Sequence, residues 1–323
     1  MQRWISPRLL HLGLLATSAL MLSFTTAAQQ RLFKRLNTDT QYQFEYVWLD
    51  EQGEQQAIQF ALEREALQDI PLQQTSYRPD IAQRYVAVEM TKAARDIDPR
   101  VARVNVQQRG DEIQVGVRAA SDAIIADVQE QLSSAKNTAF NDYLDKHYYT
   151  EYLTPLNQEA IKPDHVRYIR ESTMALIPLS QAFYEQLQQN SDARHYMNLL
   201  LGWVQNIPYN TLEDRSESHG SGFSPPFTLL SQNKGDCDSK AVLTASIVRA
   251  FLPSTPMVLV LLEEHALLGI ALPPRAGDKT IKQNGITYVM FDPTGPALLP
   301  FGKVSPDTTM AIANRRYTLE TIQ

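Results

Sequence analysis

The chain has 323 residues, of which 43% are hydrophobic and 20% are charged, and this composition is typical of a folded globular protein with one large or two ordinary domains. Its formal net charge of -6, without a clustered basic stretch, excludes nucleic acid as the main partner and argues against an anionic membrane surface. We therefore expect no nucleic-acid partner, and membrane contact only through the N-terminal segment if that segment stays uncleaved.

The N-terminal segment has the layout of a secretory signal. Two arginines precede an apolar run from about Leu12 to Phe24, and small residues follow up to Ala28. This pattern predicts a signal peptide over residues 1–28 and a periplasmic or secreted protein. The alternative is an uncleaved membrane anchor with the rest of the chain facing outside the cytoplasm, since the segment is just long enough to span a bilayer.

Residues 29–158 are expected to form a smaller N-terminal α+β domain of unknown role. Alternation of apolar and polar residues predicts strands, and spacing of three to four predicts helices. The predicted elements are, in chain order, a hairpin over 41–49 and 56–62, a helix over about 80–96, a hairpin over 101–108 and 112–119, and a helix over about 121–145. Ser121 is the expected N-cap of the last helix.

Two prolines among polar residues at 153–165 predict a domain boundary, so that residues 159–323 form a second domain. Helices are expected over about 166–189 and 191–205. The irregular loop over 210–226 follows, and loops of that length in compact domains are often functional. A mostly buried helix is then predicted from Asp238 onward by its recurring apolar residues.

Cys237 is the only cysteine of the chain. In an exported protein this excludes an internal disulfide and indicates either intermolecular pairing or a reactive thiol. The thiol lies at the expected helix N-terminus, where the helix dipole stabilises a thiolate and lowers the pKa. Its neighbours Asp236 and Asp238 act in the opposite direction. The alternative is a buried, inert cysteine, the commoner fate of a free thiol.

A nucleophilic cysteine needs a base, and the base needs an orienting group. His265 is the only histidine after Cys237, and it lies between two apolar runs that are typical of buried strands. Asp292 ends a third predicted strand, because Pro293 restricts it to extended geometry and terminates the ladder. Taken singly, the histidine is also explained as structural and the aspartate as a turn former. The order of the three favours a Cys-His-Asp site.

Three segments of the sequence resemble the Cys, His and Asp blocks of the transglutaminase-like cysteine peptidase superfamily: "GDCDSKAVLTASIVRAF", "EHALLGIAL" and "YVMFDPTGP". The resemblance extends upstream to "LLGWVQNIPYN" and "PPFTLLSQNKGDC" and covers about residues 195–296. It implies an α+β fold with a papain- or transglutaminase-like C-terminal domain, in which a nucleophile helix packs on an antiparallel sheet. Carried over by position, Cys237 is the nucleophile, His265 the base and acid, and Asp292 the orienting group.

The resemblance also bears on the oxyanion hole and on metals. The expected oxyanion donors are the backbone N–H of Cys237 and one side chain, with Gln205 and Trp203 as candidates. No cofactor is required, but some bacterial relatives hold calcium with an acidic cluster, so calcium at Asp236 and Asp238 is a further expectation. One departure weakens it, since Ser239 stands where many bacterial relatives have a second acidic residue. Phe227 also stands where relatives tend to have an acidic residue.

These residues lead to an expected function. The chain is expected to be an exported bacterial cysteine hydrolase that cleaves a peptide or amide bond of a protein or peptide substrate through a thioester intermediate. One alternative is an acyl transferase that crosslinks glutamine to amines, which must exclude water from its cleft. The other alternative is a catalytically silent binding module. The sequence does not name the substrate.

Overall fold

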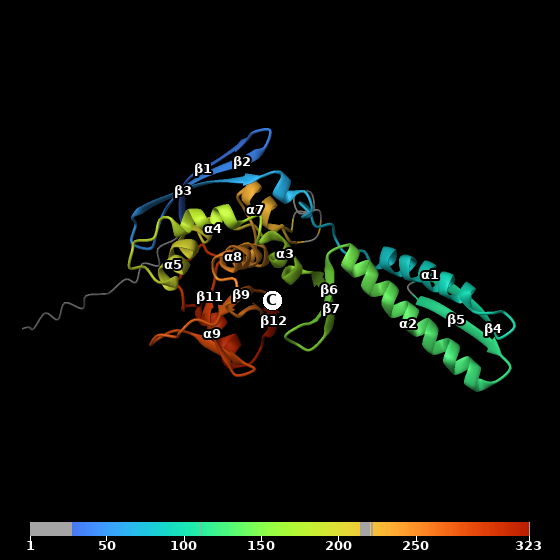
Figure 1. Ribbon diagram of the computed structural model, residues 1–323. Helices are drawn as coiled ribbons and strands as arrows, with labels where there is room; N and C mark the ends of the chain where they lie inside the picture. The colour runs from blue at the N-terminus through green and yellow to red at the C-terminus, as the bar shows by residue number, and fades with distance from the viewer. Residues whose placement is uncertain (1–27, 111, 214–219, 221, 323) are drawn as a thin grey trace, which may run out of the picture.

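The structure is a computed structural model that describes residues 28–110, 112–213, 220 and 222–322. It is a mixed α+β protein built from helices and antiparallel sheets (Figure 1), which confirms the expected fold class at this level. Residues 1–27 of the predicted signal peptide lie outside the described residues. Within the described ranges, no helix combines the length and the apolar character that crossing a bilayer requires.

A three-stranded antiparallel sheet in the order β1-β2-β3 lies along the top of Figure 1. Its strands are β1 (Gln29–Asn37), β2 (Gln41–Leu49) and β3 (Gln55–Glu63). Because successive side chains of a strand point to opposite sides, the alternating sequence gives this sheet one apolar face. That face buries Phe44, Tyr46 and Trp48 in the main hydrophobic core. The predicted hairpin of β2 and β3 is confirmed.

A five-stranded antiparallel sheet in the order β10-β11-β9-β8-β12 carries part of the candidate site. Its strands are β8 (Met257–Leu261), β9 (Ala266–Ile270), β10 (Thr280–Gln283), β11 (Ile286–Phe291) and β12 (Thr318–Ile322). β8 and β9 are buried along their whole length, which explains their unbroken apolar sequences. α9 (Pro306–Ala313) covers one face, where Ile312 packs in a cluster with Val258 and Met290.

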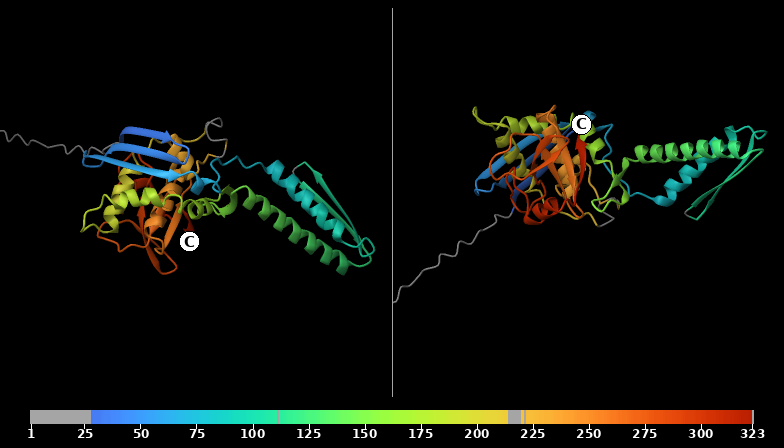
Figure 2. Two further views of the ribbon diagram at one scale, coloured as in Figure 1. Left: turned by 45° about the horizontal axis from the view of Figure 1, so that its top comes forward. Right: turned by 90° about the horizontal axis from the view of Figure 1, so that it is seen from below.

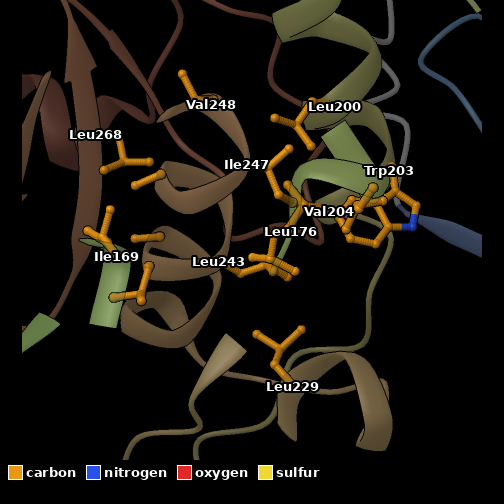
Figure 3. Close-up of a cluster of buried hydrophobic side chains, with 14 of the residues drawn as sticks. Ile169, Leu176, Leu200, Trp203, Val204, Leu229, Leu243, Ile247, Val248 and Leu268 are labelled. Atoms are coloured by element: carbon orange, nitrogen blue, oxygen red, sulfur yellow. The ribbon is translucent and has the colours of Figure 1, made fainter. Parts of the chain in front are cut away.

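α8 (Cys237–Phe251) is the central helix, and every residue from 239 to 248 is buried. A helix that is buried all round needs cover on every side. In Figure 3, Leu268 of β9 and Leu200 lie on opposite sides of α8. The helices packed around it are α3 (His165–Ser172), α4 (Ile177–Tyr184), α5 (Ala193–Val204) and α7 (Pro226–Gln232).

Residues 79–146, here called the arm, project away from the rest of the molecule, here called the body (Figures 1 and 2). The arm consists of α1 (Pro79–Asp96), β4 (Ala102–Arg109), β5 (Glu112–Ala119) and α2 (Asp122–Lys146). Its hairpin and helices enclose a small core of their own that includes Val86, Met90 and Val128. Ser121 caps α2 as predicted, because its side chain accepts a hydrogen bond from the Ile124 N–H.

The predicted boundary near residue 158 does not separate two cores. The strands β6 (Tyr149–Leu153) and β7 (Glu159–Pro163) form a hairpin at the base of the arm. Of the prolines that suggested the boundary, Pro155 lies in its turn and Pro163 ends its second strand. β2 and β3 share the main core with α5, α8 and β9, whereas the arm has its own core. The first sheet therefore belongs to the body, although the sequence places it before the arm.

The helix predicted over 166–189 is divided into α3 and α4. Pro178 lies in the first turn of α4, and proline lacks the N–H that a continuous helix would need there. The chain turns between Thr173 and Leu176, and α4 begins at Ile177, directly before this proline. A short 3₁₀ helix (Glu65–Leu67) follows β3.

Candidate active site

Cys237 is the first residue of α8. Asp236 is the N-cap, and its carboxylate accepts a hydrogen bond from the Ser239 backbone N–H at 3.0 Å. The chain arrives through Asn233, which ends α7 in the left-handed conformation, and through Gly235, where a Cβ atom would lie 2.7 Å from a side-chain carbon of α7. This close turn sets the cysteine at the helix N-terminus, as the sequence predicts.

His265 and Asp292 meet at the ends of two neighbouring strands. His265 immediately precedes β9, Asp292 immediately follows β11, and these strands pair antiparallel. His265 Nε2 lies 2.7 Å from Asp292 Oδ2, and the Thr294 backbone N–H donates to the other carboxylate oxygen at 2.9 Å. With Nε2 engaged, Nδ1 is the ring nitrogen left for a reacting group.

The hydrogen bond between these two residues changes both pKa values. Burial opposes protonation of His265, but the hydrogen bond and charge of Asp292 outweigh it, so the pKa of the imidazole is raised. Burial likewise opposes ionisation of Asp292, and the hydrogen bond from His265 outweighs it, so the pKa of this carboxyl is lowered. The pair is arranged to stabilise an imidazolium.

The thiol of Cys237 lies against the start of the same strand. The backbone N–H of Ala266, the residue after His265, interacts with the sulfur. Within the described residues, Sγ donates one hydrogen bond, to Asp238 Oδ1 at 3.4 Å, and none joins it to the imidazole. Catalytic hydrogen bonds are often long without substrate and tighten when it binds. The structure therefore places the three predicted residues near one another, at the start of α8 and at the ends of β9 and β11. The thiol is hydrogen-bonded to Asp238 and not to the imidazole.

The pKa of Cys237 is raised above its ordinary value, chiefly by burial and then by the charges of Asp238 and Asp236. The helix N-terminus alone predicts the opposite direction, and this expectation is wrong because burial and two carboxylates outweigh the dipole. The resting thiol is protonated at neutral pH. It needs a base to become a nucleophile.

The two aspartates beside the thiol do not fit a calcium site. Asp236 is engaged in the helix cap, and burial, with the charge of Asp238 adding to it, raises the pKa of Asp236 to about 7. Calcium takes about six to eight oxygen ligands. Across the described ranges, no group of three or more His, Cys, Asp or Glu side chains is placed to hold a metal ion.

The two predicted oxyanion donors have other surroundings. Gln205 Nε2 donates to the backbone oxygens of Asp292 at 2.7 Å and Leu299 at 2.9 Å, which occupies both amide hydrogens. Trp203 points away from α8 in Figure 3, and its ring packs edge-on against Tyr46 at 5.3 Å between centroids. The amide hydrogens of Gln205 are thus engaged, whereas Trp203 Nε1 is buried without a hydrogen-bond partner among the described residues. Gln205 instead holds the backbone of Asp292 in position.

Lys240 is a residue of the site that the sequence analysis does not predict. Its side chain is fully buried one turn into α8, and its ammonium donates to the backbone oxygens of Ile207 and Thr294 at 2.5 Å each. Burial lowers its pKa to about 7 against the opposing charge of Asp292. It ties two loops to the helix that begins with the cysteine. The sequence feature that could have indicated this role is a lysine within an otherwise apolar helical pattern.

A cleft of about 640 Å³ adjoins the imidazole. His265 and Asp292 line it from the sheet, the 294–299 segment lines one wall, and α9 lines another. Glu263 and Glu264, which precede the histidine in the sequence, also line it. The cleft thus reaches the base and its orienting group, whereas Cys237 is not among its lining residues.

Comparison with known proteins gives no match, since no protein-family model, curated protein or solved structure is significantly similar to this chain. The resemblance to the transglutaminase-like superfamily therefore rests on the motif blocks, and a functional proposal rests on those blocks and on the geometry of the site.

Proposed function

We propose that the chain is an exported cysteine hydrolase of the transglutaminase-like superfamily, which cleaves a peptide or amide bond through Cys237, His265 and Asp292. The observation that carries the proposal is the 2.7 Å hydrogen bond between His265 and Asp292 at the strand ends beside the start of α8. Each residue alone has an ordinary structural explanation. Their convergence from three separate elements supports a common chemical role.

The fold assignment within the α+β class belongs to the same proposal. In the papain- and transglutaminase-like arrangement, a nucleophile helix packs on an antiparallel sheet that carries the base. The packing of α8 against β9 supports this assignment. All three proposed catalytic residues lie in the body, so the proposal gives the arm no part in the chemistry.

The proposed reaction uses the three side chains as nucleophile, base and orienting group. His265 Nδ1 takes the proton from Cys237 as the sulfur attacks the carbonyl carbon, and Asp292 stabilises the imidazolium that forms. The backbone N–H of Cys237, at the N-terminus of α8, faces the developing oxyanion. The imidazolium then protonates the leaving amine and a thioester remains. Water, deprotonated by His265, attacks the thioester, which releases a carboxylic acid and restores the thiol.

The proposed chemistry requires no cofactor, because the nucleophile and the proton acceptor are both side chains. Hydrolysis is favoured over amine transfer, since transfer demands a dry cleft that positions a second substrate. We propose a protein or peptide substrate and a periplasmic or secreted location, with an outward-facing membrane anchor as the alternative. The location rests on the pattern of residues 1–28.

The test is a mass-spectrometric assay of the purified protein without its signal segment. The protein is incubated with a denatured protein mixture and a labelled primary amine, and new peptide termini, deamidated glutamines and amine incorporation are counted. Cys237→Ala and His265→Ala are expected to lower cleavage or deamidation by at least about 10³-fold. Asp292→Asn is expected to retain measurable activity after a loss of roughly 10²–10⁴-fold, because it sets the tautomer and orientation of the base.

The matched control is His195→Ala, since His195 is an exposed histidine paired with Asp192 at the start of α5. It should leave turnover unchanged. Full activity in Cys237→Ala would end the proposal. Stable amine incorporation that depends on Cys237, without cleavage or deamidation, would identify an acyl transferase, and a folded protein with no turnover of any kind would favour the silent binding module.

A further inference from the structure

Asp238 lies beside the thiol in a position that the proposed mechanism does not use. Its Oδ1 accepts the hydrogen bond of Cys237 at 3.4 Å, and its side chain is 34% exposed. Its charge acts on His265 as well. The carboxylate is therefore partly exposed to solvent beside the reacting thiol.

A buried histidine without a partner faces the same carboxylate. His165 is fully buried, and among the described residues neither ring nitrogen has a hydrogen-bond partner. Its Nε2 lies 3.8 Å from Asp238 Oδ2, just beyond hydrogen-bonding distance. Buried polar side chains are nearly always hydrogen-bonded, so this imidazole marks an incomplete arrangement. A small movement of the carboxylate toward His165 would supply the missing bond and release the thiol.

No basic side chain of the described residues is bonded to Asp238. The charges of Lys162 and His265 act on it, but Lys162 is paired with Glu320 at 2.9 Å and His265 is bonded to Asp292. Burial lowers the pKa of His165 well below its ordinary value, so this ring is neutral. The carboxylate is thus placed to accept a cation from outside the chain.

The cleft beside the imidazole, which Asp238 itself does not line, is lined mostly by acidic residues among its charged groups. Glu263, Glu264 and Asp307 line it, and within the described residues none of the three forms an ion pair. Arg316 is the basic residue among the described residues of the lining. Clefts lined by one sign of charge concentrate ligands of the opposite sign.

We propose that Asp238, backed by His165, is the specificity-determining residue of the site and receives a positively charged group of the substrate beside the scissile bond. The chemical class is a primary ammonium or a guanidinium, as on a lysine or arginine side chain or a free amine, because such groups donate charge-assisted hydrogen bonds to a carboxylate. The bound cation replaces the thiol as the partner of Oδ1, and His165 Nε2 donates to Oδ2. This inference rests on the proposed function and names its substrate class.

The test uses thiol reagents that differ only in charge, so it needs no known substrate. The second-order rates of Cys237 modification by the 2-aminoethyl (cationic), 2-sulfonatoethyl (anionic) and methyl (neutral) methanethiosulfonates are measured by mass spectrometry. The neutral reagent reports the intrinsic reactivity of the thiol, and the ratio of the cationic to the anionic rate reports the charge preference. We expect this ratio to exceed that of the denatured chain by about tenfold or more at low salt, and to fall as salt screens the carboxylate.

Variants assign the preference to one residue. Asp238→Asn is expected to lower the ratio about tenfold, and Asp238→Glu is expected to preserve most of it because the charge remains. His165→Phe, which fills the same space without ring nitrogens, should lower the ratio less, with the rate of the neutral reagent little changed. The matched control is Glu130→Gln, which removes the same charge from an exposed position on α2 of the arm and should leave the ratio unchanged.

The outcomes separate this inference from the function on which it rests. A thiol that reacts with the neutral reagent but shows the ratio of the denatured chain would overturn the inference and leave the hydrolase proposal standing. An unchanged ratio in Asp238→Asn would do the same. A folded protein whose thiol resists all three reagents and which shows no turnover in the cleavage assay would contradict the proposed function, and the inference would fall with it.

Discussion

At the scale of single residues, the start of α8 has acidic side chains beside the thiol that must become a thiolate during the reaction. Asp236 and Asp238 flank the thiol, and both raise the pKa of Cys237. A thiolate at rest would be repelled by its own neighbours, so the proton leaves only as sulfur attacks and His265 accepts it. Slow alkylation of the thiol at pH 6 would therefore be consistent with an active enzyme.

Asp236→Asn tests how much the charge of Asp236 lowers the free energy of unfolding. Asparagine caps a helix as well as aspartate does, so the bond to the Ser239 N–H is kept. The pKa of Asp236 is raised from 3.8 to about 7, so its ionisation destabilises the fold, with no cost below pH about 4 and the full cost above pH about 7. We expect the variant to be more stable than the unaltered protein at pH 8 by on the order of 2 kcal/mol.

The measurement is urea unfolding of both proteins at pH 4 and pH 8. The difference in the free energy of unfolding should vanish at pH 4. A variant that is less stable at pH 8 would show that the carboxylate of Asp236 is favoured by the helix N-terminus rather than penalised by burial.

The residues that can be predicted from the sequence are those whose role is indicated by their immediate neighbours in the chain. Cys237 follows a turn and opens a helical pattern, and Asp292 ends a strand before proline, so both positions are visible in a short window. The roles of Lys240, Gln205 and His165 depend on contacts with distant segments. A lysine that donates to two loop carbonyls and a glutamine that holds the backbone of Asp292 have no periodicity that reveals them.

At the scale of elements, the loop after β11 packs very closely against the end of α5. Gly295 has φ 67°, and a Cβ atom there would overlap the backbone carbonyl of Gln205. The side chain of the same glutamine bonds the backbone of Asp292. The orienting residue therefore owes its position to a contact between two backbones, for which glycine is needed.

Gly295→Ala is expected to destabilise the protein and to displace Asp292. The matched control is Gly285→Ala in the turn between β10 and β11, which has φ 81° and nothing within 4 Å of the added Cβ. Both changes carry the left-handed backbone penalty of about 1–2 kcal/mol. The overlap should cost Gly295→Ala about 1–3 kcal/mol more and abolish turnover. Equal free energies of unfolding for the two variants, measured in urea, would contradict the close contact.

Element prediction succeeded where one face of a segment is buried and failed where the pattern was weak or interrupted. The hairpin of β2 and β3 and the helices α1 and α2 match their predicted ranges within a few residues. β1 was not predicted, because it is an edge strand without buried residues and so lacks a clear alternation. The break between α3 and α4 had a visible cause in Pro178, which the helical spacing obscured.

At the scale of the whole molecule, the chain leaves the body once to form the arm and returns to the same place. Gln74 Nε2 donates to the His147 backbone oxygen at 3.1 Å, and the Tyr149 hydroxyl bonds the Thr75 backbone oxygen. The segments before and after the arm are thus bonded to each other. Because sequence periodicity is local, it could not show that β1–β3 complete the core of the later helices.

The separate cores predict that the arm can be removed and the first sheet cannot. Replacing residues 79–146 by a short Gly-Ser linker should leave a body that unfolds cooperatively in urea and keeps its near-UV circular dichroism. We expect a loss of only about 1–3 kcal/mol, chiefly because Tyr149 loses its contacts with the base of the arm. Deleting residues 29–63 is the contrasting change, since it strips Phe44, Tyr46 and Trp48 from the main core and should abolish cooperative unfolding. An arm deletion that unfolds the body, or a sheet deletion that leaves it folded, would show that the two cores are not independent in the way their packing indicates.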